Sequence, residues 1–119
     1  MQGDREFYRV KAVLEPCLRA AREVQALQTL AGRVAEDEVT GLADQLRVAE
    51  HRLELSRAAA DALLRECRLP VLEYRVVVER YLHAKKWDDV VTELDRTRRH
   101  VLRLHSSALH RMARALSGM

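Results

Sequence analysis

Aromatic residues, glycine and proline are scarce in this chain of 119 residues. It contains one Trp, one Phe, three Tyr, four Gly and two Pro. So few helix-breaking residues favour long helices that pack through leucine, valine and alanine. The hydrophobic fraction of 48% is too high for a disordered chain, and the charged fraction of 33% is too high for a membrane protein.

Recognisable catalytic and metal-binding motifs are also missing from the sequence. Cys17 and Cys67 are too far apart for a disulfide framework or a zinc site, and each is expected to act as a small hydrophobic residue. The chain has no G-x-S-x-G, no glycine-rich phosphate loop, no H-E-x-x-H and no Glu-x-x-His. His100, His105 and His110 are spaced five apart, so one straight helix cannot turn all three toward the same ion. We therefore predict a non-enzymatic protein with no catalytic, cofactor-binding or metal-binding residues. The linear sequence does not show side chains that converge only in the folded chain.

The N-terminal stretch MQGDREFYRV has early acidic residues and lacks the apolar core of a secretory signal. No apolar run approaches the roughly 20 residues that a transmembrane helix needs. The sequence thus predicts an intracellular, cytoplasmic protein without membrane insertion, and it leaves a nuclear or organellar location open.

Apolar residues recur in alternating steps of three and four along most of the chain, which is typical of amphipathic helices. The most regular run comprises Val39, Leu42, Leu46, Ala49, Leu53, Ser56, Ala60, Leu63 and Cys67. We predict one helical domain over residues 1–119, with an all-α, elongated, antiparallel and coiled-coil-like bundle of three to four helices. The expected helices span about 4–35, 39–68, 70–85 and 87–116.

Several boundaries of these helices can be argued from single residues. Pro16 predicts a kink or a late start of the first helix, and Pro70 predicts that the second helix stops or bends just before it. A break is expected within 35–40, with an unbroken helix as the alternative because no proline enforces a turn there. The three valines at 76–78 favour a strand, but helical spacing around them and the lack of a partner strand favour a helix over 70–85.

The C-terminal stretch 97–119 has arginine and histidine among apolar residues and no acidic residue. At about 100° per residue, its apolar side chains fall in one arc and most basic side chains fall opposite. This basic stripe comprises Arg96, Arg99, Arg103 and Arg114. Arg98 and His105 land inside the apolar arc. Because an unpaired buried charge is costly, we expect Arg98 to be paired, to meet a carboxylate of a partner at an interface, or to extend its charged end to the rim. His105 is expected to be a hydrogen-bonded core histidine or an interface residue.

Long, thin apolar seams without aromatic residues are typical of helix–helix docking. We therefore predict a non-enzymatic helical scaffold or adaptor subunit of a larger assembly, with protein partners in a homo- or hetero-oligomer. The predicted partner-binding seam comprises Leu42, Leu46, Leu53, Leu63, Arg98, His105 and Met112. The alternative is a small nucleic-acid-binding helical protein in which the basic stripe contacts phosphates. The sequence leaves open whether the seams close within one chain or between chains.

Overall fold

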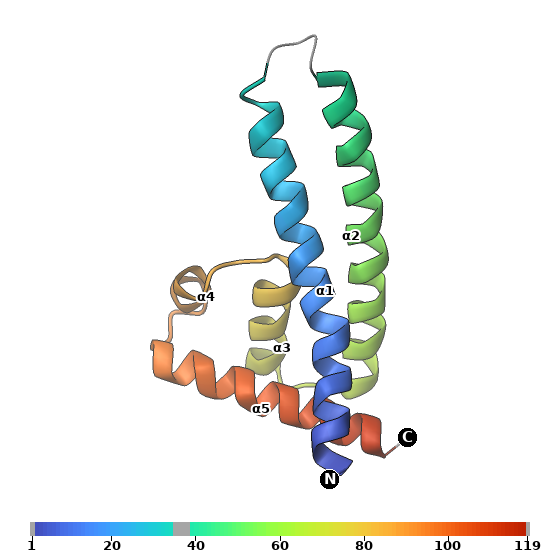
Figure 1. Cartoon of the computed structure of the whole chain (residues 1–119). Coiled ribbons are helices and arrows are strands. Elements are labelled where there is room, and N and C mark those ends of the chain that lie inside the picture. The colour runs from blue at the N-terminus through green and yellow to red at the C-terminus, as the bar shows by residue number, and fades with distance from the viewer. Residues whose placement is uncertain (1, 35–38, 119) are drawn as a thin grey trace.

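The computed structural model describes residues 2–34 and 39–118, and these residues are organised entirely as helices and short connections (Figure 1). The described residues form five α-helices and one short π-helix, which is more than the three to four helices predicted. They are α1 (Gln2–Ala31), α2 (Val39–Cys67), α3 (Val71–Val77), the π-helix η2 (Val78–Leu82), α4 (Trp87–Leu94) and α5 (Arg98–Ser117). The prediction of an all-α fold is confirmed.

The helices α1 and α2 form a long antiparallel hairpin (Figure 1). The π-helix η2 and the helix α5 pack against the lower half of this hairpin, and α5 runs across its foot instead of along it. The helices α3 and α4 pack mainly on α5 and η2. The upper half stands clear of α3, α4 and α5 as a two-helix arm, which gives the molecule its extents of 53 × 32 × 22 Å. The expected antiparallel arrangement therefore holds for α1 and α2, whereas α5 departs from it.

The first two helices follow the apolar pattern closely. The helix α1 runs through Pro16 from Gln2 to Ala31, so the late start predicted from that proline is wrong. The helix α2 begins at Val39, as predicted, and ends at Cys67, where Arg68 takes a left-handed φ of 49° ahead of Pro70. The break expected within 35–40 falls mainly on residues 35–38, which lie outside the described residues.

The third helical segment is shorter than the predicted 70–85 and widens in its last turn. The Val78 carbonyl accepts a hydrogen bond from the amide of His83, five residues later, at 3.0 Å. Such an i→i+5 bond defines a π-helix, which is rare and occurs mostly as single turns, often at functional sites. Ala84, with a left-handed φ of 55°, then ends the segment.

The predicted helix over 87–116 is wrong, because the chain turns between α4 and α5. Asp95 adopts φ 53° and ψ 48°, a left-handed conformation that Asp tolerates better than most residues. Thr97 then caps α5, since its side chain accepts a hydrogen bond from the amide of His100 at 3.2 Å. These two residues stop one helix and start another without any glycine or proline.

Three groups of buried side chains form the core. The first lies at the foot of the hairpin, where α1, α2, η2 and α5 meet around Leu14, Leu109 and Met112. The second joins α1 to α2 through mostly small residues: Cys17, Ala20, Ala21, Val24, Ala49 and Leu53, with Ala84 from the loop after η2. The third joins α3, α4 and α5 through Val76, Val90, Leu94 and Val101. Burial raises the pKa of the Cys17 thiol, which suits the role of a small hydrophobic residue that the sequence predicts.

Candidate functional site

Most leucines of the predicted seam lie inside the chain's own packing. Leu53 and Leu63 are each 8% exposed and Met112 is fully buried, while Leu46 packs against the hairpin core and Leu42 is half-buried. The seam between α1 and α2 therefore closes within one chain, a choice that the sequence leaves open. In this fold these residues hold helices of the same chain together, and a role in partner binding stays a prediction for them.

Arg98 lies on the same side of α5 as Val101 and Met112, as predicted, but its side chain is not buried there. It is the first residue of α5, its side chain is 57% exposed, and its Nη1 donates to Oδ1 of Asp88 at 2.8 Å. Leu102, also assigned to the arc, is 40% exposed, whereas Val101 is fully buried. The core therefore covers only part of the predicted arc at the start of α5. An ion pair this exposed contributes less than about 1 kcal/mol to folding.

His105 is the hydrogen-bonded interior histidine that the sequence predicts as one of two possibilities. Its Nε2 lies 2.7 Å from the hydroxyl of Tyr81, and its ring meets the Trp87 ring edge-on with 4.8 Å between centroids. Burial, and then the positive charges of Arg80 and Lys11, lower the pKa of His105 to about 4. The imidazole is therefore neutral at physiological pH.

The low pKa of His105 predicts that the fold loses stability in mild acid. As the pH falls from about 6.5 to 4, the unfolded chain binds a proton on this histidine and the folded chain does not. The free energy of unfolding should therefore fall by about 1–3 kcal/mol as the pH is lowered across this window. Above the window, His105 should contribute no pH dependence. Urea unfolding of the wild type and of His105→Gln at several pH values checks this expectation. The carboxylates titrate in both proteins, so the difference between the two pH profiles reports the contribution of His105. Parallel pH profiles for the two proteins would contradict the expectation.

The basic stripe is exposed, but one of its four members lies apart from the rest. Arg99, Arg103 and Arg114 share one solvent-facing side of α5, and none of the three pairs with a carboxylate in residues 2–34 and 39–118. Arg96 instead lies in the turn before α5, where its Nη1 donates to the carbonyl oxygens of Leu94 and Asp95.

One face of the hairpin, which we call the outer face, carries two adjoining shallow hollows. They share Glu23 and Arg52, whose Oε1 and Nη1 atoms are 3.6 Å apart. On α2, Val48 is 53% exposed and Leu55 is 60% exposed on either side of this pair. The other apolar residues along these hollows are Pro16, Ala20 and Leu27.

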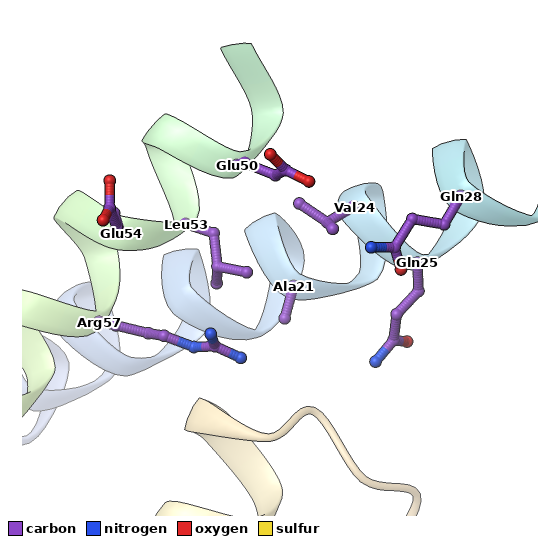
Figure 2. Close-up of a pocket in the computed structure, with 8 residues that line it drawn as sticks. All are labelled: Ala21, Val24, Gln25, Gln28, Glu50, Leu53, Glu54 and Arg57. Carbon is purple, nitrogen blue, oxygen red and sulfur yellow. The ribbon is translucent and has the colours of Figure 1, made fainter. Parts of the chain in front are cut away.

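The opposite side of the hairpin, nearer the α3–α4 segment, holds a more polar groove (Figure 2). Its floor is formed by Ala21, Val24 and Leu53, and its rim by Gln25, Gln28, Glu50, Glu54 and Arg57. The Nε and Nη2 atoms of Arg57 donate to the carbonyl oxygen of Leu82 at 3.1 and 2.9 Å, which ties α2 to the end of η2. Arg57 is therefore occupied by hydrogen bonds within the fold, and the other polar side chains of the rim are exposed to solvent.

A third hollow, of about 360 Å³, lies beside His105 and was not foreseen from the sequence. Side chains from α1, η2, α4 and α5 line it: Glu15, Arg19, Arg22, Arg80, Tyr81, Trp87 and His105, with Leu18. Trp87 and His105 are eighteen positions apart, and only the turn between α4 and α5 brings their rings together. We call this hollow the arginine pocket.

Neither a protein-family model nor a curated protein nor a solved structure matches this chain. No helix in the described part of the chain is long and apolar enough to cross a membrane. The same residues include no group of three or more His, Cys, Asp or Glu side chains placed to hold a metal ion.

Proposed function

We propose that this chain is a non-enzymatic helical scaffold subunit that assembles through the outer face of its α1–α2 hairpin. The partner that this face fits is a second copy of the chain. Two such hairpins packed together would place four helices side by side, the arrangement that the coiled-coil-like spacing of the sequence favours.

Apolar surface on the outer face is the observation that carries the proposal. In the upper arm of the hairpin, α1 and α2 cover each other on one side only. Val48 and Leu55, seven positions apart on the same side of α2, leave more than half of their side-chain surfaces open. Exposed apolar side chains on α2, beside half-buried ones on α1, form a surface that another helix pair can bury, and its burial would stabilise the arm.

The positions of the apolar residues around this pair support a second copy as the partner. Arg52 lies between Val48 and Leu55 on α2, and Glu23 faces it from α1. A twofold axis that crosses α2 near Arg52 would bring Val48 of one copy against Leu55 of the other, while each Arg52 keeps Glu23 of its own chain as its partner. The apolar part of such a face is self-complementary, as an isologous dimer requires.

The oligomeric state of the purified protein tests the proposal. We expect a concentration-dependent dimer in sedimentation velocity, and a dimer dissociation constant about tenfold or more higher for Leu55→Asp, because that change buries an unpaired carboxylate in the interface. Leu102→Asp is the matched control, since Leu102 is also exposed but lies on the first turns of α5. It should leave dimerisation unchanged.

The circular dichroism spectrum shows whether each variant has kept its helices. A wild-type protein that stays monomeric at its highest soluble concentration would refute the proposal. Equal weakening of the dimer by the Leu55 and Leu102 variants would place the contact elsewhere and refute the outer face.

Nucleic-acid binding is the second candidate, and the exposed row of Arg99, Arg103 and Arg114 favours it. Three guanidinium groups along one side of a helix match the spacing of a phosphate backbone better than scattered charges do. Under this candidate, duplex or single-stranded DNA binds with an affinity that falls steeply with added salt. Charge reversal at these three positions abolishes that binding. Both results together would favour nucleic-acid binding over the scaffold.

A further inference from the structure

The arginine pocket contains a guanidinium group that is held in place before any ligand arrives. Nη1 of Arg80 donates to the carbonyl oxygen of Lys85 at 2.9 Å, and the Cζ atom lies 4.6 Å from the centroid of the Trp87 ring. The ring covers one face of the guanidinium, while its planar edge keeps further N–H donors for a ligand. Because this side chain is already ordered, less conformational entropy is lost when it binds.

Positive charge outweighs negative charge around this group. Arg19 and Arg22 line the pocket from α1, and Glu15 is the single carboxylate among the lining residues. None of Arg19, Arg22 and Arg80 pairs with a carboxylate within the described ranges. Burial, and then the charge of Arg22, lower the pKa of Arg80, so the two arginines repel each other across the pocket. An anion between them would relieve this repulsion.

The wall of the pocket also offers a neutral hydrogen-bond donor. Tyr81 and neutral His105 carry one O–H and one N–H between them, and their mutual bond of 2.7 Å uses only one of these protons. Whichever group donates in that bond, the pair keeps the other proton free. Burial raises the pKa of Tyr81, which keeps the phenol protonated.

Backbone geometry provides an independent reason to regard this pocket as a site. Arg80 and Tyr81 are consecutive residues of the π-helix η2, and both line the pocket. In a regular α-helix, neighbouring side chains diverge by about 100°, and the wider π turn changes where they point. Single π turns are found frequently at functional sites.

We propose that the arginine pocket binds a small organic oxyanion, a carboxylate or phosphate attached to a flat ring. The oxyanion lies between Arg22 and Arg80, where forked N–H donors match its oxygens, and the ring packs beside Trp87 and His105. The volume of about 360 Å³ is large enough for a ligand of this size. This site shares Arg19 with one hollow of the outer face, while Arg22, Arg80 and the two rings lie outside that face.

Trp87 provides the readout, because it is the single tryptophan of the chain and it lines the pocket. Its fluorescence is followed while phenyl phosphate, benzoate, inorganic phosphate or phenol is added to the full chain. We expect saturable changes with phenyl phosphate or benzoate, weaker binding of inorganic phosphate, and no binding of uncharged phenol at the same concentrations. Phenol that binds as well as the anions would overturn the proposal, and so would a lack of any response to both ring-bearing anions.

Two charge-reversal variants distinguish a specific anion-binding site from general attraction of anions to a positively charged protein. Arg22→Glu, at an exposed position on α1, should raise the dissociation constant of phenyl phosphate by about tenfold or more, because a charge-assisted contact is lost. Arg99→Glu changes the net charge equally on the far α5 stripe and should have little effect. Equal weakening by both variants would mean that the anion responds only to net charge, and the proposal would be wrong.

Discussion

Leu53→Asp should abolish the cooperative folded state of this protein. Leu53 is 8% exposed and packs between α1 and α2 among small side chains such as Ala21 and Ala49. The substitution removes the largest apolar side chain of that group and places a carboxylate where the group has no partner for it. The cost of about 4 kcal/mol or more is close to the whole stability of a small domain. Thermal unfolding followed by circular dichroism should show a lost or strongly broadened transition.

Leu55→Asp is the matched control for this experiment. The same change of residue occurs two positions further along α2, at a side chain that is 60% exposed. At a protein concentration low enough to keep the chain monomeric, it should change the free energy of unfolding by less than about 1 kcal/mol. If the two variants melted alike, the assignment of the buried face of α2 would be wrong.

Arg111→Met should destabilise the fold by about 2–3 kcal/mol, although Arg111 itself is half exposed. Its Nε donates to Oε1 of Glu73 at 3.1 Å, and Glu73 is the buried charged residue of the described core at 4% exposure. Methionine keeps most of the apolar stem but leaves the carboxylate buried without its partner. Urea unfolding near neutral pH measures the loss.

A second substitution shows whether the buried charge causes this effect. In the Arg111→Met background, Glu73→Gln removes the charge and keeps the shape, so we expect it to recover at least half of the lost stability. A double variant that is less stable than Arg111→Met would show instead that the unpaired charge of Glu73 does not cause the loss.

The apolar spacing predicted the hairpin well, because a long amphipathic pattern reflects burial directly. The start of α2 at Val39 and the buried positions of Leu53 and Leu63 agree with that spacing. The predicted first helix over about 4–35 agrees with α1, which runs through Pro16 without the late start, because packing at Leu14 and Cys17 offsets the lost hydrogen bond. Such tertiary compensation is not visible in a local pattern.

The turn between α4 and α5 shows why the C-terminal half was harder to predict. Asp95 and Thr97 are residue types that favour turns and helix N-caps, but no glycine or proline accompanies them, so the apolar spacing was extended through the turn. The angular count placed Arg98 on the apolar side of α5, but it could not show that the core leaves Arg98 uncovered there. The arginine pocket was missed for a related reason, because the π turn that carries Arg80 has no known signature in the spacing of side chains.

The position of α5 across the foot of the hairpin has a consequence for the order in which the protein folds during synthesis. The α1–α2 hairpin is built from neighbouring segments and can form as soon as Cys67 has left the ribosome. Val10 and Leu14, on α1, are covered by Leu109 and Met112, on α5, which is synthesised later. The nascent chain therefore carries an uncovered apolar foot until α5 emerges, and it is this intermediate that a chaperone would have to shield from aggregation.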